Sequence, residues 1–129
     1  MTIVSTTKPN QAYHKFVGFL TKKFPINRPN NIEIRLEDYK YIPYKVNGEL
    51  TRAYATINAV RNSDKLVIRL AVGKNGHTIK EKLNSIAHEY CHCMQHYRGE
   101  VFNTDWDARL ELEAIEFANS VVSSYYKMI

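Results

Sequence analysis

Residues 78–99 read TIKEKLNSIAHEYCHCMQHYRG, and the fold expected for the chain depends mainly on this stretch. Thr78 and Glu81 have the spacing of a capping box, in which each side chain accepts a hydrogen bond from the other residue's backbone N–H. Gly99 is typical of the residue that follows the end of a helix. Between these signals, apolar residues recur at helical spacing: Ile79, Leu83, Ile86, Tyr90, Cys93 and Tyr97. The stretch therefore predicts a helix from about Ile79 to Arg98.

This helix carries two histidines four residues apart, His88 and His92, which project side by side on the face opposite the apolar residues. A catalytic zinc ion takes three protein ligands and keeps one position for water. Glu89, next to the first histidine, can reach such a water as a general base. The pattern H-E-x-x-H on a helix is typical of zinc metallopeptidases. It predicts His88 and His92 as metal ligands and Glu89 as the catalytic base; the alternative is a surface helix that carries two histidines by chance.

The third ligand has to come from another part of the chain. His96 lies eight residues beyond His88, which is about 12 Å along a helix axis, so it cannot join the same site. No histidine follows it in the sequence. A short loop leads into a second predicted helix that runs to about Tyr126, and short connections make two helices neighbours. We therefore expect an acidic ligand on that helix, and its candidates are Asp107, Glu111, Glu113 and Glu116.

The segment EAIEFA at residues 113–118 resembles the Glu-Ala-x-x-Phe-Ala segment that supplies the third ligand in small bacterial and phage metallopeptidases, including the immunity-repressor-cleaving group. Residues 86–100 also resemble the active helix of phage-encoded SprT-like proteins. The resemblance covers residues 78–119 and implies Glu113 as the third metal ligand in a gluzincin-like His/His/Glu site with a zincin-like fold. Phe117 stands where thermolysin-like proteins place an aspartate that orients a histidine. The acceptor for the histidines is thus left open among Asn84, Ser85, Glu116 and a backbone carbonyl.

The rest of the chain indicates an α+β fold. Residues 9–24 have helical periodicity, and Pro25 marks the end of that helix. Alternating apolar residues between Ile32 and Leu70 predict strands, and Asn47-Gly48 is a strong hairpin signal. We therefore expect an N-terminal helix, a small and mainly antiparallel sheet, the helix with H-E-x-x-H and a C-terminal helix with the third ligand. The 129 residues suit a single domain, residues 1–129.

The composition of the chain bears on its location in the cell, its partners and its disulfide bonding. No apolar run is long enough to cross a membrane, and the first residues lack the pattern of a signal peptide, so a cytoplasmic protein is expected. The net charge of +5 is spread along the chain and points only weakly to nucleic acid. Cys91 and Cys93 lie about 200° apart around a helix axis, so they cannot form a disulfide with each other. Nothing in the sequence specifies an oligomeric state.

The sequence as a whole predicts a zinc-dependent metallopeptidase that hydrolyses peptide bonds in a protein or peptide substrate, with Glu89 as general base. An extended substrate could add to a sheet edge such as the Leu66–Leu70 strand. One alternative is a non-catalytic, zinc-stabilised interaction or regulatory module of phage or mobile-element origin, in which a protein side chain fills the fourth metal position. Another is a basic, DNA-associated protein whose binding depends strongly on salt.

Overall fold

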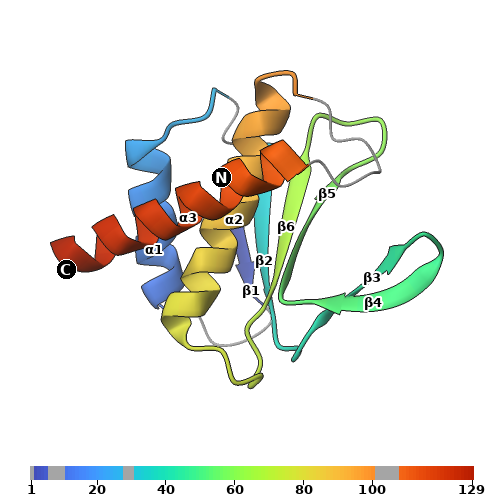
Figure 1. Cartoon of the computed structure of the whole chain (residues 1–129), viewed down its shortest axis with the longest axis horizontal. Helices are drawn as coiled ribbons and strands as arrows, with labels where there is room; N and C mark the ends of the chain where they lie inside the picture. The colour runs from blue at the N-terminus through green and yellow to red at the C-terminus, as the bar shows by residue number, and fades with distance from the viewer. Residues whose placement is uncertain (1, 6–10, 28–30, 101–107) are drawn as a thin grey trace.

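The computed structural model describes residues 2–5, 11–27, 31–100 and 108–129. Six strands and three helices lie in these ranges, and Figure 1 shows how they are arranged. In chain order they are β1 (Thr2–Ser5), α1 (Gln11–Lys23), β2 (Ile32–Glu37), β3 (Ile42–Val46), β4 (Glu49–Ala53), β5 (Ala55–Ala59), β6 (Leu66–Ala71), α2 (Ile79–Tyr97) and α3 (Ala108–Met128). None of these helices combines the length and the apolar character that a membrane span needs.

The larger sheet has the strand order β1-β2-β6-β5. Strands β1, β2 and β6 run parallel to one another, whereas β5 pairs with β6 in the antiparallel sense. Strands β3 and β4 form a separate antiparallel hairpin, and both residues of its Asn47-Gly48 turn have positive φ, 50° and 83°, as the hairpin signal predicts. The α+β fold is confirmed. The two parallel pairings, and strand β1 itself, were not predicted.

The helices pack on the larger sheet and on one another. In Figure 1, α2 lies along the sheet, α1 lies beside it and α3 crosses both. The alternation of β2 is visible in its burial, since Ile32, Ile34 and Leu36 face the core while the residues between them are more exposed. The apolar residues predicted for one side of α2 are buried from Leu83 to Cys93. The core between sheet and helices therefore sets the direction in which the opposite side of α2 presents its histidines.

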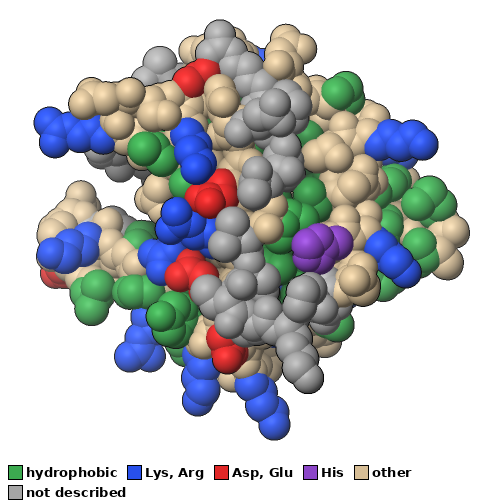
Figure 2. All heavy atoms as spheres, turned by 180° about the vertical axis from the view of Figure 1, so that it is seen from behind, with side chains coloured by type: hydrophobic (Ala, Val, Ile, Leu, Met, Phe, Trp, Pro, Cys, Tyr) green, Lys and Arg blue, Asp and Glu red, His purple; other side chains and the backbone are tan. Residues whose placement is uncertain are grey.

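Acidic and basic side chains alternate on the exposed parts of the sheet. Glu33 pairs with Arg35 and with Lys65, and Glu37 accepts a hydrogen bond from Nη2 of Arg69 at 2.9 Å. Figure 2 shows Lys and Arg side chains at several separate places on the back of the molecule, some of them beside acidic groups. On this face the positive charge is distributed and partly paired, which differs from the continuous basic stripe that nucleic-acid binding favours.

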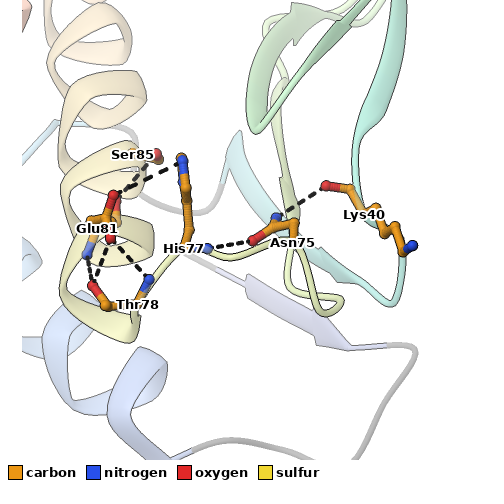
Figure 3. Close-up of polar contacts among 6 residues, drawn as sticks. All are labelled: Lys40, Asn75, His77, Thr78, Glu81 and Ser85. Atoms are coloured by element: carbon orange, nitrogen blue, oxygen red, sulfur yellow. Dashed lines mark hydrogen bonds and ion pairs between the residues drawn. The ribbon is translucent and has the colours of Figure 1, made fainter.

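The start of α2 is held by the predicted capping box (Figure 3). Thr78 Oγ1 accepts a hydrogen bond from the backbone N–H of Glu81 at 3.1 Å, and Glu81 Oε1 accepts one from the backbone N–H of Thr78 at 3.1 Å. The preceding loop is tied to the β2–β3 connection, because Asn75 accepts from the backbone N–H of His77 and donates to the carbonyl of Lys40. These bonds fix where α2 begins, and therefore where each later residue lies around its axis.

The end of α2 and the length of α3 also follow the predictions. Gly99 has φ of 85°, the left-handed conformation that commonly ends a helix. The apolar residues predicted for α3 are buried, except that Phe117 is half-buried: Leu110, Ala114, Ala118, Val121, Val122 and Tyr125. The proposed cap at residues 104–107, which includes the candidate ligand Asp107, lies outside the described residues, as do the first residues of the predicted 9–24 helix.

Candidate metal centre

Two neighbouring turns of α2 and the first turn of α3 bring three metal-ligating side chains together. His88 Nε2 lies 2.7 Å from Glu111 Oε1, and His92 Nε2 lies 3.1 Å from Glu111 Oε2. The two Nε2 atoms are 3.2 Å apart. One ligand atom of each residue falls within 4.8 Å of the others, which forms a group that could hold a metal ion. The spacing of four residues on one helix thus brings the two imidazole rings side by side.

The donor set fits a zinc ion. Two imidazole nitrogens and a carboxylate are a ligand set that catalytic zinc sites use. Without a cation or a proton between them, two ring nitrogens and a carboxylate at these distances would face one another with lone pairs. Burial lowers the pKa of His88, partly offset by the carboxylate of Glu111, so the neutral, metal-binding form of this imidazole is favoured. The side chains remain 10–26 % exposed, which leaves the group open to solvent on one side.

Glu113, the third ligand implied by the resemblance, does not join this group. Its Oε1 accepts hydrogen bonds of 2.7 Å from Gln95 Nε2 and from Arg98 Nη2. Both donors lower the pKa of Glu113, so its carboxylate is held in the charged form. Glu111 and Glu113 are two residues apart, about 200° around the helix axis, so only one of them can face the histidines. The structure places Glu111 beside the histidines, at the position where the resemblance implies Glu113.

The other candidates lie apart from the group. Glu116 is exposed on α3 and contributes no ligand atom to the metal group found among the described residues. Asn84 donates to Asn119 and Ser85 donates to the backbone carbonyl of Glu81, so neither side chain is directed at a histidine by these bonds. Instead, Nδ1 of His92 lies 2.8 Å from Oε1 of Gln95. The sequence signal for this partner was the spacing of three residues, which places Gln95 beside His92 on one face of the helix.

The two cysteines do not take part. Both are buried free thiols on α2. Burial raises the pKa of Cys91 to about 12 and also raises the pKa of Cys93, which disfavours the thiolate form that binds a metal. The absence of a bond between them agrees with the helical spacing of the two residues.

Glu89 points into a small pocket beside the histidines. The pocket has a volume of about 230 Å³ and is lined by Tyr54, Ala55, Asn84, Ser85, His88 and Glu89. Only 9 % of Glu89 is exposed. Burial, and to a smaller extent the charge of Glu111, raises the pKa of Glu89 to about 8. A carboxyl group with a raised pKa, next to two converging imidazoles, has the properties of an acid or base in catalysis.

The same pocket reaches the start of β5, which is an edge of the larger sheet. Strand β5 pairs with β6 alone among the described residues. The Leu66–Leu70 strand, considered above as a substrate edge, is β6, and it lies between β2 and β5 with both sides paired. That expectation is wrong, because β6 has no free hydrogen-bonding side. Among the described residues, β5 is an edge strand whose first residue, Ala55, lines the same pocket as Glu89.

Comparison with known protein families identifies the chain. A peptidase-family model described as the IrrE N-terminal-like domain matches residues 56–128. The chain belongs to this family. The match covers more than half of the sequence and includes β6, α2 and α3, hence every residue of the group described above. Searches of curated proteins and of solved structures gave no match.

Membership of the IrrE N-terminal-like family confirms the resemblance read from residues 78–119. The family consists of zincin-like metallopeptidases that cleave repressors. It supports a peptidase function for this chain, and the group of His88, His92 and Glu111 could supply the metal site that such a function needs. The matched range begins in β5 and continues through β6, α2 and α3.

The raised pKa of Glu89 predicts a pH-dependent stability in the metal-free protein. The folded pKa of about 8 lies above the ordinary value of 4.5, so the neutral carboxyl is favoured on folding. The contribution is fully present below pH 4.5 and is lost as the pH rises through 8. Glu89→Gln stays neutral throughout. We therefore expect its stability advantage to grow with pH, to as much as about 5 kcal/mol.

Denaturant unfolding of both proteins in the presence of a chelator, at a series of pH values from about 5 to 9, measures this difference. The matched control is Glu116→Gln on α3, since Glu116 is exposed and its neutralisation should give a difference that varies little with pH. A gap between Glu89→Gln and the parent protein that stays constant over this range would show that Glu89 is not buried in its neutral form.

Proposed function

We propose that this chain is a zinc-dependent peptidase in which His88, His92 and Glu111 hold the metal and Glu89 is the general base. The observation that carries the proposal is the convergence of the two Nε2 atoms on the two oxygens of one carboxylate, within 4.8 Å, in a member of a metallopeptidase family. Zinc is the metal we propose because the donor set is two imidazoles and one carboxylate.

A zinc ion bound there would polarise the scissile carbonyl and make a water molecule more acidic. The protein supplies the remaining steps. A carboxylate oxygen of Glu89 accepts a proton from the attacking water and later delivers it to the nitrogen of the leaving amine. In the metal-free structure burial raises the pKa of Glu89 to about 8, and the positive charge of a bound metal would lower it again, toward the carboxylate that accepts the proton. The carboxylate of Glu111 would balance part of the charge of the metal, and His88 and His92 would hold it through neutral imidazoles.

We propose that the substrate is an extended protein segment that adds to β5. Among the described residues no strand pairs with the second side of β5, and this side can form backbone hydrogen bonds with a bound chain, which gives an affinity that tolerates many side chains. Ala55, the first residue of β5, lines the pocket together with His88 and Glu89, so a segment on this edge would pass beside the catalytic groups. Tyr54 forms the adjoining wall, where its ring stacks on His77 at 3.6 Å. Since the family cleaves repressors, a repressor protein is the first substrate class to test.

The described residues favour this function over a structural metal site. The metal group contains three ligating side chains from the described part of the chain, and a catalytic zinc ion uses three and keeps a position for water. A structural site would be closed by a fourth side chain. The non-catalytic module therefore lacks a specific observation in its favour.

Metal removal and reloading test the proposal. We expect purified protein to bind one zinc ion per chain, measured by elemental analysis. We also expect it to cleave members of a library of unfolded peptides, measured by mass spectrometry. A chelator should remove both the metal and the cleavage, and added zinc should restore them. Protein that binds no zinc would contradict the metal site. Zinc binding without any chelator-sensitive cleavage would contradict the peptidase proposal and support the regulatory module.

A further inference from the structure

Gln95 is a fully buried amide on α2, one turn after His92, and each of its polar atoms has a partner. Its Oε1 lies 2.8 Å from Nδ1 of His92. Its Nε2 donates to the backbone carbonyl of Leu110 at 2.9 Å and to Oε1 of Glu113 at 2.7 Å. A buried amide is stabilising only when it is hydrogen-bonded in this way, so the side chain is held in one orientation.

The partners of Gln95 determine which end of the amide faces the histidine. A backbone carbonyl and a carboxylate only accept hydrogen bonds, so the amide group directed at Leu110 and Glu113 must be the NH₂. The carbonyl oxygen of Gln95 is then the atom that faces His92. An oxygen of this kind accepts a hydrogen bond, so Nδ1 of His92 must carry the proton.

The consequence for His92 appears on the other side of its ring. A neutral imidazole with its proton on Nδ1 has a lone pair on Nε2. Nε2 is the atom that lies 3.2 Å from His88 Nε2 and 3.1 Å from Glu111 Oε2. The lone pair is thus directed into the group of ligand atoms, as metal binding requires.

We propose that Gln95 is a positioning residue that sets the tautomer and the ring orientation of His92, and that Glu113 and the Leu110 carbonyl hold Gln95 in place. This inference rests on the proposed zinc site, for which it supplies the hydrogen-bond acceptor of one ligand. Arg98 continues this chain of hydrogen bonds, because its Nη2 donates to the same oxygen of Glu113 at 2.7 Å. Glu113, expected from the resemblance to bind the metal, thereby acts on it through Gln95 and His92.

The test replaces Gln95 by Leu and reads the tautomer of His92 directly. Long-range proton–nitrogen NMR of the metal-free protein, at a pH where the imidazoles are neutral, distinguishes protonation at Nδ1 from protonation at Nε2. We expect His92 of the parent protein to be protonated at Nδ1 and the Gln95→Leu variant to shift toward Nε2. Zinc affinity, measured by competition with a chromogenic chelator, should fall about 10- to 100-fold.

A compensating pair separates positioning from simple packing. In the double variant Gln95→Glu with Glu113→Gln, the new carboxylate still accepts from Nδ1 of His92 and can accept from the new amide, while the bonds to the Leu110 carbonyl and to Arg98 are given up. We expect this pair to keep the parent tautomer and to regain part of the zinc affinity. The single variant Gln95→Glu, which sets two carboxylates against each other, should bind zinc more weakly than the pair.

The tautomer and the affinity distinguish the possible failures. If His92 of folded Gln95→Leu keeps its proton on Nδ1 and its parent affinity, the positioning role is excluded. If Gln95→Leu does not fold, the double variant decides, because protonation of its His92 at Nε2 would overturn the proposal. If the parent protein binds no zinc, the proposed function fails, whereas the NMR result in metal-free protein still supports or overturns the role of Gln95.

Discussion

Replacing Glu111 by alanine is expected to abolish stoichiometric zinc binding, whereas replacing Glu113 by alanine should leave zinc bound. Glu111 is the carboxylate that lies 2.7 Å and 3.1 Å from the two histidine Nε2 atoms, while Glu113 contacts Gln95 and Arg98. Tight zinc sites bind with roughly 10–16 kcal/mol over their ligand set, so loss of one ligand should cost about 3–4 kcal/mol, or roughly 10²–10³ in affinity. Loss of Glu113 should cost about tenfold at most, through Gln95.

Elemental analysis and chelator competition on the two alanine variants measure this contrast. Glu116→Ala is the matched control, because it removes an exposed carboxylate from the same helix. The resemblance to the Glu-Ala-x-x-Phe-Ala segment makes the opposite prediction. If Glu113→Ala loses zinc and Glu111→Ala retains it, the ligand assignment made from the structure is wrong and the one made from the resemblance is right.

Glu89→Gln is expected to keep zinc and to lose peptide cleavage. The substitution preserves the shape of the side chain and removes its ability to accept a proton. General acid–base catalysis contributes about 10²–10⁴ to a rate, and here one group serves both proton transfers, so we expect a loss of about 10³ or more in kcat/KM. Because the neutral amide avoids the cost of burying a charge, the loss of activity cannot be attributed to unfolding.

The measurement compares cleavage of the same library of unfolded peptides by the zinc-loaded parent protein and the zinc-loaded Glu89→Gln variant. Glu116→Gln is again the control, and it should cleave at the parent rate. Zinc-loaded Glu89→Gln that cleaves at more than a tenth of the parent rate would show that another group moves the protons, while the metal ligands could remain as assigned.

The parts of the fold that local chemistry determines could be predicted from the sequence. The capping box at Thr78 and the glycine at residue 99 mark the two ends of α2 within one residue of where they lie. The Asn47-Gly48 turn identifies the β3–β4 hairpin, because its two positive φ values suit few other residue types. Each of these signals acts over only a few residues, so no knowledge of the remaining chain was needed.

The parts that depend on distant packing could not be predicted. Strands β1, β2 and β6 pair in parallel, although the alternation of apolar residues in β2 is more typical of an antiparallel sheet. Glu111 and Glu113 are equally plausible from their spacing, since the choice depends on how α3 is rotated against α2. The sequence resemblance favoured Glu113. In the structure Glu113 accepts hydrogen bonds from Gln95 and Arg98, which leaves Glu111 to face the histidines.

The ligands of the candidate site come from two helices, with His88 and His92 on α2 and Glu111 in the first turn of α3. A metal ion bound by them would form a cross-link between these helices that is absent from the metal-free chain. Binding to the folded state alone adds RT ln(1 + [L]/Kd) to its stability. The packing of α3 on α2, which covers the core beneath it, would then depend on the supply of zinc as well as on apolar contacts. The supply of metal would therefore affect the lifetime of the folded protein as well as its ability to cleave a substrate.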